Sequence, residues 1–472
     1  MTRMTIPSTG PMLFLRAASP DGMRVAATCL RPQDAAPPRF ATDRDLKAEA
    51  LVTRAGATLW RVMMDLPLGR ATYTCDGTEY TVATDTTGDM TIAFASCNGQ
   101  ERGDLDRPPE DRNSMWAHLA KRLDDETIPL LLNGGDQIYA DEVTQAHSLS
   151  EGWPKNVPHN LTGSEWSDLR DALAKAFFER YATQWAQAGF ADVVARVPSL
   201  CVWDDHDICD GWGSLRRRAQ TSDVAKVLYS AAREAYLLFQ FGCTRTERPE
   251  ICLQGSEALS WRVDLPGVTI VAPDLRATRD KRKIMSDDAW AAFRPALQDT
   301  QNRTFVISSV PALGPRLSLV ERAMKLTPRM EDYEDDLRDQ WQSYAHRAEW
   351  QRFLSALMKL HDEGDRRVTV LSGEIHLAMR ATMRTDTGPL HQLVASGISH
   401  PAPREALATC LSLLAKLGEA PLKGHPIRLH GLPDKTRPYT AERNYLLLRR
   451  TGENWDARWQ LEDSGETNAL PI

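Results

Sequence analysis

The stretch IPLLLNGGDQIYAD, residues 128–141, decides the fold class of this chain. An apolar run is followed by two glycines and then by Asp136 and Tyr139, which is typical of a short buried strand with polar groups at its end. The same arrangement recurs in TIAFASC (91–97), SLCVWDDHD (199–207) and VTVLSGEIH (368–376). Continuous apolar strands belong to sheets covered on both faces, so the polar clusters should converge along one rim. The pattern therefore predicts an α/β protein with a metal site at its strand ends.

From residue 89 onward, strands alternate with helices, which indicates sheets flanked by helices. The predicted strands are residues 90–96, 128–134, 198–204, 268–274, 303–310, 366–373 and 391–397. The predicted helices, with apolar residues three and four positions apart, are residues 114–123, 166–189, 222–241 and 335–364. The segment 442–461 reads as two strands joined by TGEN, so a hairpin should close the domain.

Residues 1–88 have a different amino-acid pattern, which predicts a small antiparallel β unit. This unit is best described as an N-terminal β-sandwich domain of immunoglobulin or fibronectin type III character. Short Thr-, Val- and Tyr-rich segments alternate there with Gly, Pro and Asp turns. Residues 33–45 contain two consecutive prolines and should form a loop. We therefore expect two domains, residues 1–88 and residues 89–472.

Composition excludes several classes of protein. The 472 residues carry a net charge of −7 without a long block of one sign, so an extended nucleic-acid surface is not expected. No apolar core of signal-peptide length occurs in the first thirty residues, and no stretch approaches the roughly twenty apolar residues of a membrane span. We expect a cytoplasmic protein whose eight dispersed cysteines are reduced thiols.

The polar residues are of the types that a two-metal phosphoesterase requires. Such a site holds two cations about 3.5–4 Å apart, which activate water and neutralise phosphoryl oxygens. Asp136 follows two glycines that let the backbone bend sharply and present a carboxylate able to bridge two ions. Tyr139 offers a phenolate for trivalent iron, and Cys97 offers a thiolate that suits a transition metal better than calcium or magnesium alone.

Five motifs in order resemble the alkaline phosphatase D (PhoD-like) branch of the calcineurin-like metallophosphoesterases. They are Ser96-Cys97, GDQIY (135–139), WDDHD (203–207), DLRATR (274–279) and SGEIH (372–376). The resemblance covers about residues 90–400 and implies a four-layered α/β/β/α metallophosphoesterase fold, often preceded by a β-sandwich. It also implies a metal-dependent phosphatase or phosphodiesterase whose substrate is a small phosphate ester.

The resemblance assigns roles to individual residues. Cys97, Asp136 and Tyr139 would hold a ferric ion, and Asp136 would bridge to a second cation, expected to be calcium. Asp205 resembles a ligand of that second ion and is assigned to catalysis with it. His206 resembles the histidine that contacts the scissile phosphate and protonates the leaving oxygen.

Further residues complete the predicted site. Glu374 and His376 of SGEIH match metal-site residues of the family motif, although Glu374 stands where an aspartate is usual. That extra methylene leaves metal identity open among iron, calcium, manganese, zinc and magnesium. Arg276 is expected to bind substrate phosphate in a bidentate manner, with a surface salt bridge to Asp274 or Asp280 as the alternative.

Structural interpretations of the same residues stay open. Cys97 alone could be a small buried hydrophobe, and Glu374 with His376 could be a satisfied core pair. His400, after the last predicted strand, receives little weight as a site residue. The competing hypothesis for the whole chain is a binding scaffold with a metallophosphoesterase fold and little or no turnover, and a phospholipase-like relative with different metals is the alternative enzyme.

Overall fold

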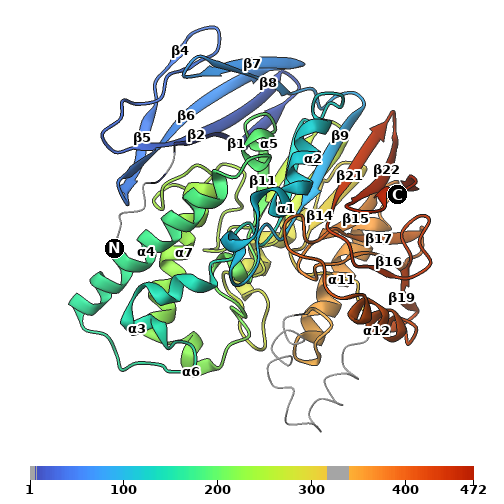
Figure 1. The fold of residues 1–472 in the computed structure, drawn as a ribbon. Coiled ribbons are helices and arrows are strands. Elements are labelled where there is room, and N and C mark those ends of the chain that lie inside the picture. Colours follow the sequence, from blue (N-terminus) through green and yellow to red (C-terminus); the bar gives the residue numbers. More distant parts are fainter. Residues whose placement is uncertain (1–5, 7, 316–339) are drawn as a thin grey trace.

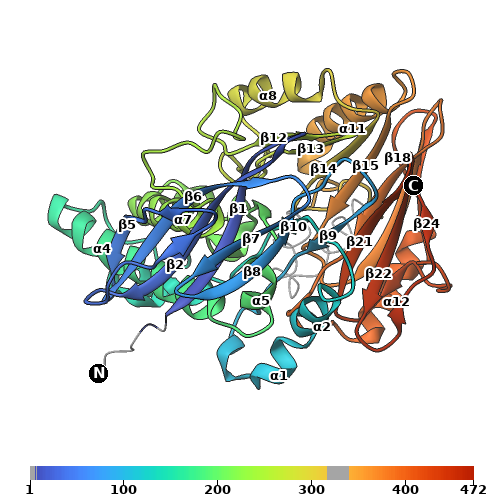
Figure 2. The same ribbon diagram turned by 90° about the horizontal axis from the view of Figure 1, so that it is seen from above.

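Two large β-sheets packed face to face form the centre of the computed structural model (Figure 1). The structure describes residues 6, 8–315 and 340–472. Helices lie on the outer face of each sheet, so the layers run helix, sheet, sheet, helix (Figure 2). Between the sheets, the Trp459 indole donates a hydrogen bond to the Val394 carbonyl at 2.8 Å. The predicted four-layered α/β fold is confirmed.

The first sheet has eleven strands in the order β23-β22-β21-β9-β10-β11-β1-β2-β6-β5, with β24 beside β22. The neighbours β9, β10, β11 and β1 run parallel, whereas the remaining pairs are antiparallel. The bounds are β1 Thr9–Ser19, β2 Gly22–Pro32, β5 Glu49–Arg54, β6 Ala57–Pro67, β9 Met90–Ala95, β10 Leu130–Gly134, β11 Ser199–Val202, β21 Asn444–Thr451, β22 Asn454–Leu461, β23 Gly465–Glu466 and β24 Leu470–Pro471.

The second sheet has nine strands in the order β12-β13-β14-β15-β17-β16-β19-β18, with β20 beside β16. Its centre, β13 to β14 to β15 to β17, is parallel. The bounds are β12 Trp261–Leu265, β13 Val268–Ala272, β14 Arg303–Ile307, β15 Arg367–Ser372, β16 Ala378–Arg384, β17 Pro389–Val394, β18 Glu419–Leu422, β19 His425–His430 and β20 Tyr439–Thr440.

The parallel strands of both sheets end on the same side of the sandwich, because residues that follow them are hydrogen-bonded to one another. The backbone N–H of Cys97, after β9, donates to the Gly135 carbonyl after β10 at 3.1 Å. The N–H of Ile398, after β17, donates to the Ser96 carbonyl at 3.0 Å and so joins the second sheet to the first. Strand ends of two sheets thus meet at one rim, as the sequence predicts.

Helices cover the two outer faces of the sandwich (Figure 2). The helices α4 and α7 pack on each other beside β1 and β11, and α11 packs on β15 of the second sheet. The bounds are α1 Pro109–Arg112, α2 Ser114–Arg122, α3 Ser148–Glu151, α4 Gly163–Trp185, α5 Phe190–Val194, α6 Arg217–Gln220, α7 Asp223–Gln240, α8 Asp287–Phe293, α11 Arg347–His361 and α12 Glu405–Ala415. A full capping box at Thr162 and Glu165 begins α4.

The N-terminal strands belong to two sheets. Strands β1, β2, β5 and β6 extend the first large sheet, because β1 pairs in parallel with β11 through Phe14 and Ser199. Strands β3 (Phe40–Ala41), β4 (Asp45–Leu46), β7 (Arg70–Cys75) and β8 (Thr78–Ala83) form a separate small sheet beside them (Figure 1). The N-terminal β unit is thus continuous with the first large sheet, and a domain boundary at residue 88 stays a prediction.

Two local expectations need correction. Residues 33–45, predicted to be a loop, contain the short strand β3 and end at the start of β4, because Phe40 is buried and pairs with Cys75 and Leu46. The helix predicted over residues 335–364 is shorter in the structure. Residues 335–339 lie outside the described part of the chain, and α11 begins only at Arg347, after a 3-10 turn at Tyr344–His346. No described helix is both long and apolar enough to cross a membrane.

A buried histidine makes the stability of this fold depend on pH. The His361 side chain at the end of α11 is buried, and its Nδ1 atom accepts a hydrogen bond from the Val368 backbone N–H at 3.1 Å. Burial lowers the pKa of His361 to about 4, below the roughly 6.5 expected in the unfolded chain. Between these values the unfolded chain binds the proton, so the free energy of unfolding should fall as pH decreases from about 6.5 to about 4.

A His361→Asn variant tests this prediction, because the Asn Oδ1 can replace the Nδ1 acceptor without titrating. Melting temperatures measured by circular dichroism across the same pH range should fall less steeply for the variant than for the wild type. Burial also lowers the pKa of His391 to about 4, so part of the slope should persist. Parallel curves for the two proteins would contradict the assignment.

Candidate metal centre

The backbone at the shared rim is strained at predicted site residues. Cys97, Asp136, Glu374 and His376 have φ angles of 56°, 54°, 70° and 54°, in the left-handed region that residues with a Cβ rarely occupy. Such conformations cost about 1–3 kcal/mol each and persist where the surrounding structure imposes them. The chain therefore uses strained backbone to present these side chains from β9, β10 and β15.

Two glycines allow the strand ends to approach closely. A Cβ at Gly135, whose φ is +109°, would lie 2.9 Å from the Asp204 Cβ and 3.2 Å from the Ser309 Cβ. A Cβ at Gly373 would lie only 2.3 Å from the Ser96 Oγ. The close approach of the two sheets at this rim therefore depends on glycine at both positions.

One set of predicted ligands converges at this rim. The Cys97 sulfur, an Asp136 carboxylate oxygen and a His376 ring nitrogen lie within 4.8 Å of one another. The Tyr139 hydroxyl lies 2.9 Å from His376 Nε2, and the Cys97 sulfur lies 3.2 Å from the Ser396 hydroxyl. Thiol, carboxyl, phenol and imidazole groups together match the soft and hard donors of a transition-metal site.

A second set shares Asp136 with the first. Carboxylate oxygens of Asp136, Asp204 and Asp205 lie within 4.8 Å of one another. Within the described residues, the buried Asp136 Oδ1 atom has no hydrogen-bond partner. An orphaned buried carboxylate oxygen between two ligand groups is costly unless a cation binds it, so the donor set fits a pair of metal ions.

Burial and neighbouring acidic groups raise the pKa values of the candidate ligands at this rim. Burial raises the pKa of Asp136 well above its ordinary value, and the Asp204 carboxylate raises it further. Burial raises the pKa of Cys97, and the nearby Asp136 raises it further. Burial also raises the pKa of Tyr139, and Cys97 adds to that increase. Without a cation these groups favour their neutral forms, whereas a bound cation would stabilise the carboxylate, thiolate and phenolate.

Asp207 is a structural anchor for the two aspartates. Its Oδ2 accepts hydrogen bonds from the backbone N–H groups of Asp136 and Asp204, both at 2.9 Å. Its Oδ1 accepts from the Gln240 amide at 2.9 Å. Asp207 thus holds the ends of β10 and β11 at a fixed separation.

Arg276 is not placed to meet a substrate. Its side chain is fully buried, and its guanidinium pairs with Asp204 through Nε and with Asp205 through Nη2 at 3.3 Å. Nη1 donates to the Trp212 carbonyl at 3.1 Å. The predicted substrate contact therefore needs correction: Arg276 is an internal counter-ion that balances two of the clustered carboxylates.

Replacing Arg276 by glutamine should destabilise the protein, because it leaves the carboxylates of Asp204 and Asp205 without their buried counter-ion. We expect the free energy of unfolding of the metal-free protein to fall by roughly 3–5 kcal/mol in urea denaturation. The matched control is Arg24→Gln, since the Arg24 pair with Asp65 is exposed and should contribute at most about 1 kcal/mol. Unchanged stability with a raised KM would instead support a substrate contact for Arg276.

His206 is held by a carboxylate that the sequence reasoning overlooked. The two Asp141 oxygens lie 3.0 Å from His206 Nδ1, and Asp141 also accepts from the Asp210 backbone N–H at 2.6 Å. Burial lowers the pKa of His206, but Asp141 and Asp205 outweigh it and raise the pKa well above its ordinary value. Asp141 closes the stretch 128–141, so its position five residues after Asp136 was the available signal.

His400 lies closer to the centre than its sequence context indicated. Its ring stacks on His376, with 3.4 Å between ring centroids, and lies 5.5 Å from the Tyr139 ring. His400 Nε2 lies 3.1 Å from a Glu101 carboxylate oxygen, and these residues with His376 form a further group of potential ligands. Neither residue stands in a motif, so only the structure reveals them.

Glu374 lies at the edge of the centre. Both of its carboxylate oxygens accept from the Gln340 amide, at 2.6 and 2.7 Å. Among the described residues it joins none of the groups whose ligand atoms converge. A ligand role for Glu374 stays a prediction.

The protein has the fold of the metallophosphoesterases, which is two sheets enclosed by helices. Thiol, carboxyl, phenol and imidazole groups gather at the strand ends, where a metal site of this class is expected. The sequence model of the PhoD related phosphatase family matches residues 78–333 of this chain. This chain belongs to the PhoD related phosphatase family.

Individual relatives are distant. The uncharacterized protein YGR266W of Saccharomyces cerevisiae is 22% identical over 441 residues, which cover 73% of this chain and 62% of that protein. The solved structure of PhoD matches with a TM-score of 0.60 at 14% identity, covering 98% of this chain and 87% of PhoD. Purple acid phosphatase PPD1 from yellow lupin (Lupinus luteus) seeds matches with a TM-score of 0.56 at 10% identity, covering 98% and 73%. At these identities the two structures share the fold with this chain.

Proposed function

We propose that this protein is a metal-dependent phosphoric ester hydrolase that acts on small phosphomonoesters or phosphodiesters. The observation that carries the proposal is the position of Asp136, whose carboxylate belongs to two groups of converging ligand atoms, one with Cys97 and His376 and one with Asp204 and Asp205. A carboxylate shared in this way is what a bridged two-metal centre requires. The family match over residues 78–333 supports the same conclusion.

The ligands divide into two groups around Asp136. Cys97, Tyr139 and His376 would hold one ion with it, and their donor types favour ferric iron. Asp204 and Asp205 would hold the second ion, for which their oxygen donors favour calcium or another hard cation. When bound, the ions supply activation of water and neutralisation of phosphoryl charge.

His206 is the residue that would protonate the leaving oxygen. Asp141 fixes the ring through Nδ1, which leaves Nε2 to carry the proton toward the substrate. Its ring lies 4.4 Å from the Tyr139 ring, so the proposed acid stands beside the proposed iron ligands. The ring is also restrained from turning away, because Asp141 is itself bonded to the backbone of Asp210.

One observation favours a second candidate function, a binding scaffold with little turnover. Glu374, which replaces the aspartate usual in the family motif, is bonded to Gln340 and stands apart from the converging ligands. A centre that lacks one ligand could bind a phosphate ester without hydrolysing it. Metal content together with turnover separates the two functions.

The test begins with protein purified without chelators and analysed for bound elements. Hydrolysis of p-nitrophenyl phosphate and bis-p-nitrophenyl phosphate is then measured with and without added calcium. About one iron per chain with calcium-dependent turnover would support the proposal, and the preferred substrate would distinguish a monoesterase from a diesterase. Metal without turnover on either ester would favour the scaffold, and failure to bind metal after reconstitution would refute the ligand assignment.

A further inference from the structure

Helix α12 (Glu405–Ala415) differs from an ordinary surface helix, because it exposes leucine side chains to solvent. Its fully buried side chains are small, Ala408, Ser412 and Ala415, and Leu411 packs partly buried against the core. Its solvent side carries Leu407 and Leu413, which are 49% and 58% exposed. A helix that packs on a domain normally buries its leucines and exposes its polar residues, so this pattern needs an explanation.

The exposed leucines form one continuous apolar ridge. Leu407, Cys410, Leu413 and Leu417 are spaced three, three and four residues apart, which places them along one side of the helix and its C-terminal turn. Of the six exposed large hydrophobic side chains in the described part of the chain, three belong to this ridge. Exposed leucines scattered singly are ordinary, but a contiguous row marks a surface that binds something apolar.

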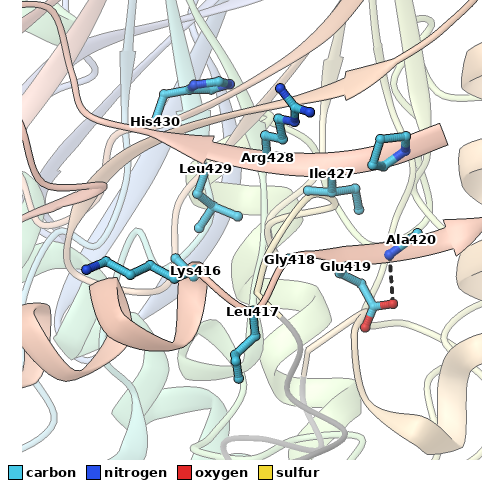
Figure 3. A pocket seen from close by; sticks show the side chains of 11 residues that line it. Lys416, Leu417, Gly418, Glu419, Ala420, Ile427, Arg428, Leu429 and His430 are labelled. Carbon is cyan, nitrogen blue, oxygen red and sulfur yellow. Dashed lines mark hydrogen bonds between the residues drawn. The ribbon is translucent and has the colours of Figure 1, made fainter.

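A basic hollow adjoins the ridge. Its volume is about 620 Å³, and it lies between the end of α12 and strands β18 and β19. Figure 3 shows Lys416 and Leu417 on one side of this hollow and Arg428 and His430 on the strand opposite. Lys416 and Arg428 are exposed, and the described part of the chain contains no ion pair for either.

The surroundings of α12 carry positive charge in an acidic protein. Residues 404–437 contain six lysines and arginines against three acidic residues, whereas the whole chain has a net charge of −7. Arg404 lies at one end of the helix and Lys416 at the other, both exposed. Cations that flank a leucine row can keep their charges at a polar surface while the leucines enter an apolar layer.

We infer that α12 docks on an anionic phospholipid surface. Leu407, Leu413 and Leu417 enter the boundary between headgroups and acyl chains, and Lys416 and Arg428 contact lipid phosphates. Helices that lie in a membrane interface combine an apolar face with flanking Lys and Arg in this manner. The inference rests on this surface and does not depend on the proposed hydrolase activity.

Charge and composition favour a membrane over the other occupants. A symmetric dimer formed through this face would bring the same cations of two copies together, which is repulsive. Protein interfaces usually rely on aromatic anchors, and the α12 sequence EALATCLSLLA contains none. The exposed aliphatic row next to the exposed cations Lys416 and Arg428 is complementary to acyl chains beneath phosphates.

Docking would also orient the candidate metal centre. Glu405, the first residue of α12, follows His400 by five positions, and the His400 ring stacks on His376. The start of α12 is therefore linked by a short segment to the rim at which the strand ends of both sheets meet. We expect docking to bring that rim close to phosphate esters at the membrane surface.

Vesicle co-sedimentation of the 472-residue chain tests the inference. The vesicles are phosphatidylcholine alone and phosphatidylcholine with phosphatidylserine. The wild type should bind the anionic vesicles, and binding should weaken as salt is added. The double variant Leu413→Gln with Leu417→Gln should bind at least about tenfold more weakly, because it removes two inserted side chains. Lys416→Gln with Arg428→Gln should reduce binding to anionic vesicles by about fivefold for each charge.

The matched control is Leu68→Gln with Leu105→Gln, two exposed leucines outside the ridge, and it should bind as the wild type does. Circular dichroism melts of all variants verify folding, which is expected because every substituted side chain is exposed. Absence of binding to either vesicle, or equal binding by the ridge variant and the wild type, would refute the inference. A dimer in sedimentation velocity that the ridge variant dissolves would also refute it, because a second copy would then cover α12.

Discussion

The Asp136→Ala variant should retain neither metal ion and should lose at least about a thousandfold in kcat/KM on p-nitrophenyl phosphate. The reason is geometric, because the Asp136 carboxylate belongs to two groups of converging ligand atoms, one for each proposed ion. Removing it takes a ligand from each ion and disconnects the two halves of the centre. Elemental analysis after desalting gives the metal content, and the hydrolysis rate is measured on the same samples.

Stability provides an independent readout for Asp136. Burial and the Asp204 carboxylate raise its pKa well above the ordinary value, so a charged Asp136 is unfavourable in the metal-free fold. Asp136→Asn, which keeps the shape and cannot ionise, should therefore melt at or above the temperature of the chelated wild type. Added metal should raise the melting temperature of the wild type but not that of the variant. Metal bound at wild-type stoichiometry in either variant would contradict the bridging role.

The His206→Ala variant should keep both metals and lose roughly a hundredfold to ten-thousandfold in kcat, because it removes the proton donor to the leaving oxygen. The loss should depend on the leaving group. p-Nitrophenolate departs readily without a proton, whereas an alkoxide does not, so an alkyl phosphate should suffer more than p-nitrophenyl phosphate. Rates on both esters with measured metal content separate loss of the acid from loss of the site.

Asp141→Asn is the companion variant, because Asp141 holds the His206 ring at Nδ1 without belonging to the converging ligands. It should reduce kcat less than His206→Ala does. As in that variant, the loss should be larger on an alkyl phosphate than on p-nitrophenyl phosphate. Asp192→Asn, a substitution in α5 away from the rim, controls for the loss of one aspartate. Equal losses on both esters in His206→Ala would contradict a leaving-group role, and full activity would remove His206 from the mechanism.

Much of the fold could be predicted because buried strands have a strong local signature. The apolar runs at residues 90–96, 128–134 and 198–204 appear as β9, β10 and β11, and the hairpin at 442–461 appears as β21 and β22. The residues at which helices begin were less predictable. Residues 340–346 have a helical pattern but form turns before α11, because Gln340 and Gln342 bond to groups across the rim, Glu374 and the Pro311 carbonyl.

The candidate site was predictable only in part. Cys97, Asp136, Tyr139 and His376 could be chosen from motif and strand position, and the structure brings their side chains together. The same reasoning placed Arg276 at the substrate, whereas it is buried against Asp204. A sequence shows that an arginine follows a strand, but it does not show whether the guanidinium faces solvent or a carboxylate on another strand.

The sequence by itself determined the alternation of strands and helices, the position of ionisable side chains at strand ends, and the family. These features are local, because an apolar run and the residue after it are neighbours along the chain. Tertiary structure decided which strand ends meet, that Asp136 is shared, that His400 stacks on His376, and that α12 exposes Leu407 and Leu413. These depend on contacts between residues far apart in the chain, set by the packing of two sheets and by glycines that permit close approach.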